Sequence, residues 1–178
     1  MKTRSLAATV GLMFSVSAFA ASPYVGQESR EIKALSPEEV SALVTGKGMG
    51  LAKAAELNGF AGPAHVLELA NELHLSSDQR ARTAALFSSM SARAATQGRA
   101  LVEKERELDG LFASRTITAE RLARTLREIG ALQAEVRRAH LEAHLAQVEI
   151  LTAEQNSRYR ALRGYGSAAR PGGHGHKH

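Results

Sequence analysis

Two histidines four residues apart, His140 and His144, form the best metal-binding pair in the sequence. On a helix, residues at this spacing lie one turn apart on the same face, so both imidazoles can bind one ion. Zinc is the divalent ion that we expect, because imidazole is among its preferred ligands. Other side chains with donor atoms are candidate further ligands: His65, Glu68, His74, Glu142 and Met49.

The position of the pair along its predicted helix bears on this interpretation. About eighteen residues make five helical turns, so His140 shares the angle of Leu122, and His144 that of Leu126. Both rings are therefore expected near the packed side of the helix, where a buried imidazole needs a partner. The alternative is two partly exposed histidines without a ligand. A hydrolytic zinc site is not indicated, because His-Leu-Glu-Ala-His does not match the H-E-x-x-H pattern.

A second group of histidines lies at the C-terminus. Three of them alternate with other residues after Gly172 and Gly173: His174, His176 and His178. Mobile imidazoles of this kind bind zinc, copper or nickel loosely. The alternative is a solvated or appended tail without a ligand.

Arginines are frequent along the helix that carries the histidine pair: Arg121, Arg124, Arg127, Arg137 and Arg138. Glutamates lie among them, so the bland interpretation is a solvated face with ion pairs. The functional interpretation is a basic, partly apolar surface that holds acidic or unfolded client proteins weakly.

Other chemistry finds little support in the sequence. The chain has no cysteine, which excludes thiolate metal sites and cysteine nucleophiles. No serine, lysine or carboxylate pair has a recognisable catalytic context, so we predict that the protein is not an enzyme. The glycines at positions 46, 48 and 50 follow no predicted strand and precede no Gly-Lys-Ser/Thr, so a hinge is favoured over a nucleotide loop. No organic cofactor is expected.

Residues 1–20 have the pattern of a signal peptide. Lys2 and Arg4 precede an apolar stretch over residues 6–19, and Ala18-Phe19-Ala20 matches a cleavage site. Removal of Lys2 and Arg4 lowers the formal charge from +5 to +3. We therefore predict a mildly basic periplasmic protein that binds no nucleic acid, with no later stretch able to span a membrane.

The composition and periodicity predict an all-α fold. Residues 21–35 are expected to form a flexible arm and residues 166–178 a disordered His-rich tail, on either side of a helical domain over residues 36–165. A short helix is predicted to open at Ser36 and Pro37, before the glycines that interrupt it. Two more are predicted at 51–57, stopped by Asn58-Gly59 and Gly62-Pro63, and at 65–73. Longer helices are predicted over 77–112 and 118–150, followed by a short one after Thr152.

The two long helices are joined by a short turn and must pack as an antiparallel hairpin. The second of them also has Leu141, Leu145 and Val148 on another side, which one partner helix cannot cover. We therefore predict a homodimer, intertwined or cradle-like.

A pentad of the form Leu-Thr-x-x-Gln occurs intact at Leu151, Thr152 and Gln155, and in degenerate form at Leu75 and Gln79. Both copies begin predicted helices in an exported helical chain, which resembles the Spy/CpxP family of periplasmic stress proteins over residues 65–165. The resemblance implies an all-helical dimer that acts without ATP. Spy-like members hold unfolding proteins on a concave face. ZraP-like relatives bind zinc and have His-rich tails, and CnrX-like relatives sense metals through a paired i, i+4 site that His140 and His144 match.

Three functions remain open from the sequence. The first is a metal-binding stress or heavy-metal resistance protein with chaperone capacity, centred on His140 and His144. The second is a holdase chaperone whose histidines are incidental. The third is a regulatory partner of an envelope sensor protein.

Overall fold

The computed structural model describes residues 22–165, so the predicted signal peptide and the His-rich tail with His174, His176 and His178 lie outside the described residues. The described chain is all-α, as predicted, and residues 22–165 contain no strand. Its helices are α1 (Pro37–Thr45), α2 (Lys53–Glu56), α3 (Pro63–Glu68), α4 (Ser77–Ala113), α5 (Ala119–Val148) and α6 (Ala153–Leu162). Within that part of the chain, no helix combines the length and apolarity that crossing a bilayer requires.

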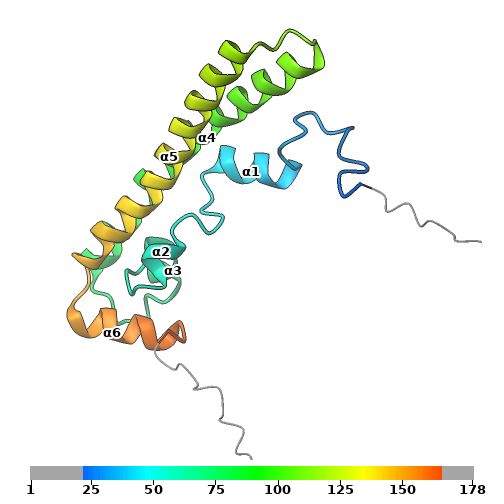
Figure 1. Cartoon of the computed structure of the whole chain (residues 1–178). Coiled ribbons are helices and arrows are strands. Elements are labelled where there is room, and N and C mark those ends of the chain that lie inside the picture. Colours follow the sequence, from blue (N-terminus) through cyan, green and yellow to red (C-terminus); the bar gives the residue numbers. More distant parts are fainter. Residues whose placement is uncertain (1–21, 166–178) are drawn as a thin grey trace, which may run out of the picture.

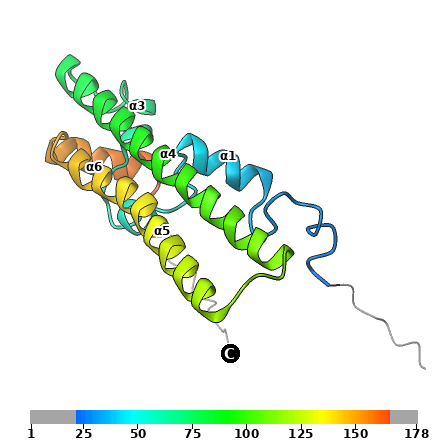
Figure 2. The same cartoon turned by 90° about the horizontal axis from the view of Figure 1, so that it is seen from above.

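The predicted antiparallel hairpin is confirmed as the pair α4 and α5, which lie side by side along their lengths (Figures 1 and 2). Ion pairs join the two helices at separate levels: Lys104 to Glu128, and Arg93 to Glu142, each at 2.7 Å between nitrogen and oxygen. Thr118 caps α5 by accepting a hydrogen bond from the Arg121 amide. The short turn leaves the second helix no course other than back along the first.

Local side-chain bonds begin three of the helices at the predicted residues. Ser36, Ser76 and Thr152 each accept a hydrogen bond from the backbone of the residue three positions on. The side chain of that later residue, a glutamate in α1 and a glutamine in α4 and α6, accepts from the amide of the cap. Each capping box satisfies two amides that a helix start leaves unpaired, so these boundaries are encoded locally.

The prediction of a helix over residues 65–73 was wrong in its bounds. Pro63 does not stop a helix but occupies the first turn of α3, and α3 ends at Glu68. Proline suits that position because its φ is already helical and the amide that it lacks would have no partner there. Turns continue to His74, which has a φ of +51°. This left-handed residue reverses the chain before α4.

The segment predicted as a flexible arm consists of turns, and its last residues are anchored on the hairpin. Ile32 is buried against the hairpin core. Lys33 forms an ion pair with Asp109 at 3.0 Å, and Arg106 donates to Glu31 at the same distance. Residues 31–33 therefore contact α4 near the hairpin turn.

Two apolar clusters lie at different levels of the hairpin. The first joins α1 to the middle of α4 and α5 through Leu43, Leu101, Ile129 and Val136. The second lies at the end opposite the hairpin turn, where α6 crosses below α2 and α3 (Figure 1). Its members come from α3, from the chain on either side of it, from the residue before the Thr152 cap and from within α6: Ala61, Val66, Ala70, Leu73, Leu75, Leu151 and Tyr159. Between the clusters on α5 lie His140 and His144.

Candidate metal centre

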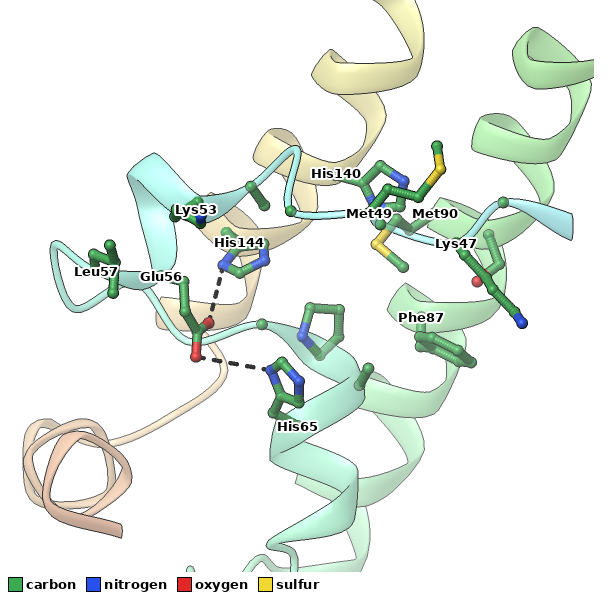
Figure 3. Close-up of a pocket in the computed structure, with 18 of the residues that line it drawn as sticks. Lys47, Met49, Lys53, Glu56, Leu57, His65, Phe87, Met90, His140 and His144 are labelled. Carbon is green, nitrogen blue, oxygen red and sulfur yellow. Dashed lines mark ion pairs between the residues drawn. The ribbon is translucent and has the colours of Figure 1, made fainter. Parts of the chain in front are cut away.

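The histidine pair opens on a cavity of about 700 Å³ between the hairpin and the chain that links α1 to α3. Three of its lining side chains are histidines, His65, His140 and His144, and two are methionines, Met49 and Met90. Figure 3 shows His140 near Met49 and Met90 at one end, Glu56 and His65 at the other, and His144 between them. The glycine-rich stretch 46–50 forms part of the wall.

His140 is almost completely buried, at 3% exposed, and its Nε2 has no hydrogen-bond partner. Burial, together with the neighbouring His144, lowers the pKa of His140, so its ring is neutral near pH 7. A Cβ atom at Gly48 would lie 3.7 Å from Nδ1 of His140, so the loop passes beside the ring. A neutral imidazole with an unpartnered nitrogen is the form of histidine that binds metals.

His144 is held in a defined orientation by the chain before α3. Its Nδ1 lies 2.8 Å from the carbonyl oxygen of Phe60. Because a carbonyl oxygen can only accept, Nδ1 donates in this bond and the lone pair of a neutral ring is on Nε2. The backbone at Gly62 passes so close that a Cβ there would lie 2.7 Å from Cε1 and 2.8 Å from Nε2 of His144. Histidines that bind metals are commonly oriented by a backbone carbonyl in this way.

Glu56 is a buried carboxylate that connects the cavity to α6 and to the residues directly after it. Its Oε1 accepts hydrogen bonds from the hydroxyl of Tyr159 at 2.6 Å, the hydroxyl of Tyr165 at 3.1 Å and Nε of Arg163 at 3.3 Å. Burial and the bond to Glu56 raise the pKa of Tyr159, which keeps this phenol a donor.

The other carboxylate oxygen of Glu56 faces the histidines. Oε2 has no hydrogen-bond partner and lies 3.8 Å from Nδ1 of His144, and Oε1 lies 3.7 Å from Nδ1 of His65. Glu56 is therefore the carboxylate closest to the pair, although the sequence alone did not single it out.

The structure separates the remaining candidate ligands from the cavity. His74 and Glu68 are exposed and do not line it. Glu142 is exposed on the hairpin and bonded to Arg93 at 2.7 Å. Among residues 22–165, no three histidine, cysteine, aspartate or glutamate side chains are grouped as a ready-made ion site. The structure thus brings together His140, His144 and His65, and leaves His74 outside.

Two lining residues that sequence reasoning missed are Glu56 and Met90. Met90 lies among the apolar residues of α4, which indicate packing and not a site, and its position opposite His140 follows from the pairing of α4 with α5. Glu56 interrupts a short apolar stretch, which is a weak signal. Both become visible as site residues only when α2 and α4 are placed against α5.

The arginines of α5 lie on its exposed side, which is compatible both with a solvated, ion-paired face and with a surface for client proteins. Arg138 pairs with Glu135 at 2.6 Å and lies 3.6 Å from Glu142. Among residues 22–165, the other four arginines have no ion pair with a carboxylate. Leu126, at 48% exposed, lies between Arg124 and Arg127.

The two copies of the pentad contact each other. Leu75 and Leu151 belong to the same apolar cluster. Gln79 donates to the side-chain oxygen of Gln155 at 2.8 Å, and Gln155 donates back to that of Gln79 at 3.0 Å. Gln155 also donates to the carbonyl of Leu73, and Gln79 to the carbonyl of Ile150. The motif therefore begins two helices and joins their starts.

Comparison with known proteins agrees with this motif. The model of the LTXXQ motif family protein matches residues 63–163, which include both pentads, α3 to α6 and the histidine pair. Searches of curated proteins and of solved structures find no match. Because the match covers more than half of the chain, the chain belongs to the LTXXQ motif family, which is the Spy/CpxP-like family.

Proposed function

We propose that this protein binds a transition metal ion, with zinc expected, through His140 and His144, and acts in the periplasm in the response to heavy metals or envelope stress. The observation that carries the proposal is a pair of buried imidazoles that line one cavity, one with an unpartnered nitrogen and one oriented by a carbonyl. Membership of the Spy/CpxP-like family and the predicted signal peptide support the periplasmic location.

The residues present fit a zinc ion in their chemistry. Zinc takes nitrogen and oxygen ligands, commonly four in a tetrahedral arrangement. His140 and His144 would supply the imidazoles, and the free carboxylate oxygen of Glu56 lies nearby, on the Nδ1 side of the His144 ring. Because residues 22–165 group no three histidine, cysteine, aspartate or glutamate side chains as an ion site, water would occupy the positions that the two imidazoles leave open.

Calorimetric titration with Zn²⁺ tests the proposal. The reference protein is the mature chain in which His174, His176 and His178 are replaced by serine, so that the tail cannot bind. We expect saturable binding in the micromolar range or tighter, of roughly −8 kcal/mol or more in binding free energy. The variant with His140→Ala and His144→Ala should lose this binding, because both nitrogen ligands are removed.

The matched control is His74→Ala, which removes an exposed histidine outside the cavity and should leave the affinity unchanged. Circular dichroism should show that the double variant keeps its helices, since alanine is the better helix former. Equal Zn²⁺ affinity in the double variant and the reference protein would contradict the assignment of the site.

A chaperone without metal dependence is the second candidate, favoured by the exposed arginines of α5 and by Leu126 among them. Such a surface combines positive charge with apolar area, which suits weak binding of unfolded chains. Suppression of client aggregation that is equal with and without Zn²⁺, and equal in the double histidine variant, would favour this function over the first.

A further inference from the structure

Soft sulfur donors gather at one end of the cavity. The chain has four methionines, of which Met49 and Met90 lie in the described residues, and both of these line the cavity with His140. Met49 is in the loop after α1 and Met90 is in the middle of α4, so only the tertiary structure brings them together. Thioethers are weak hydrogen-bond acceptors but good ligands for soft metal ions.

Met90 and His140 occupy the same level of the hairpin. Gln147 on α5 donates to the hydroxyl of Thr83 on α4 at 3.2 Å, which sets the pairing of the two helices. Met90 follows Thr83 by seven residues and His140 precedes Gln147 by seven. Because seven residues make almost two turns and the helices are antiparallel, both side chains return to the facing side at one level.

Met90 and His140 are both buried, and one nitrogen of the His140 ring has no hydrogen-bond partner. Met90 is 7% exposed and His140 is 3% exposed, and Nε2 of His140 has no hydrogen bond. A buried polar nitrogen without a partner destabilises a fold. A ligand that binds this nitrogen would remove that cost.

Met49 lies on the opposite wall in an unfavourable backbone conformation. Its φ is +44°, a left-handed conformation that is unfavourable for a residue with a side chain, and it lies between Gly48 and Gly50. Gly48 passes beside the His140 ring, and Met49, the next residue, lines the same cavity. Figure 3 shows Met49 and Met90 on the His140 side of His144, away from Glu56 and His65.

We propose that His140, Met49 and Met90 form a site for a soft monovalent cation, Cu⁺ or Ag⁺, at the sulfur end of the cavity. This site rests on the proposed function because both use the imidazole of His140. It adds the class of ion that the sulfur end of the cavity takes. Imidazole and thioether ligands suit Cu⁺, whereas carboxylate and imidazole suit Zn²⁺. Two or three ligands suffice for these monovalent ions, so the absence of a carboxylate at this end is no obstacle.

Titration with silver nitrate in chloride-free buffer tests the site without the need for a reductant. The protein is the mature chain with the three tail histidines replaced by serine and with ¹³C-labelled methionine methyl groups. Met49→Leu and Met90→Leu assign the two signals. We expect both signals to shift until one equivalent of Ag⁺ is bound, and by more than Zn²⁺ shifts them, because Zn²⁺ binds the imidazole and not the sulfur atoms.

The variant with Met49→Leu and Met90→Leu provides the matched comparison. Leucine keeps the volume of methionine and removes the sulfur, so the fold should be retained. We expect Ag⁺ affinity to fall by on the order of a hundredfold, about tenfold for each thioether, with Zn²⁺ affinity unchanged. Met49→Leu alone changes an exposed loop residue and should show the smaller loss even if the double variant is unstable.

The two proposals fail in different ways. Unmoved methyl signals with Ag⁺, or equal Ag⁺ affinity without the thioethers, would overturn the sulfur site while Zn²⁺ binding at His140 and His144 could persist. Failure of the proposed function appears instead as Zn²⁺ binding that is absent or indifferent to the double histidine variant.

Discussion

Glu105 is a single carboxylate on the buried side of α4, where its neighbours at helical spacing are Leu101, Val102 and Leu108. It is 9% exposed, and burial raises its pKa. A raised pKa in the folded state means that the charged form is disfavoured there relative to the unfolded chain. This residue therefore makes the stability of the hairpin depend on pH in a direction that can be measured.

Glu105→Gln should stabilise the protein at pH 7 by about 1 kcal/mol, the usual scale of a single substitution, because the amide carries no charge into the hairpin. Below the unfolded carboxyl pKa, near roughly 4.3, wild-type Glu105 is protonated in both states and this advantage should vanish. The free energy of unfolding of the wild type, relative to that of the variant, is therefore highest in acid and falls as pH rises through the raised folded-state pKa of Glu105.

Urea unfolding of both proteins between acidic and neutral pH measures the effect. Glu72→Gln, at an exposed position, serves as the control and should show little difference at any pH. An advantage of Glu105→Gln that is largest in acid would show that burial of the charge is not the cause.

At the scale of elements, the docking of α1 on α4 depends on one glycine. A Cβ atom at Gly98 would lie 2.7 Å from the carbonyl carbon of Leu43 and closer still to its oxygen. Gly98 in the middle of a helix costs about 1 kcal/mol relative to alanine. The close crossing of α1 and α4 explains why a glycine occupies this position despite that cost.

Gly98→Ala should therefore destabilise the protein by about 1–3 kcal/mol, since the overlap with Leu43 outweighs the gain in helix propensity. Gly130→Ala is the matched control on α5, where a Cβ would meet nothing within 4 Å, and it should stabilise by about 1 kcal/mol. Chemical unfolding followed by circular dichroism measures both, and a stabilised Gly98→Ala variant would show that α1 does not pack there as described.

At the scale of the whole molecule, the two pentads join parts of the chain that are far apart in sequence. The reciprocal bonds between Gln79 and Gln155 connect the starts of α4 and α6, next to the apolar cluster that contains Leu75 and Leu151. The end of the molecule opposite the hairpin turn is held together by these contacts. The homodimer remains a prediction from the unpartnered apolar residues, among which Leu145 is 57% exposed.

A double-mutant cycle measures the connection between the pentads. Gln79→Ala and Gln155→Ala should each cost about 1–3 kcal/mol, because each leaves the other amide without its partner. The combined variant should cost less than the sum of the two. Gln133→Ala, at an exposed position of α5, is the control. Strictly additive losses would show that the two amides do not interact.

The sequence by itself determined most of the helices and the approach of the two central histidines. Ser36, Ser76 and Thr152 begin helices through bonds that span three residues, so no distant contact is required. A short turn makes the long helices antiparallel, and a four-residue step places His140 and His144 on one side of α5. These features follow from local spacing, which sets the angle of a side chain about its own helix.

Only the tertiary structure decided what faces those histidines. Glu56, Met49 and Met90 reach the cavity because α2, the glycine-rich loop and α4 pack around one segment of α5. His65 lines the cavity and His74 does not, although both were equal candidates in the sequence. Local periodicity orients a side chain but does not specify which distant element fills the space opposite, because that depends on how the whole chain buries its apolar surface.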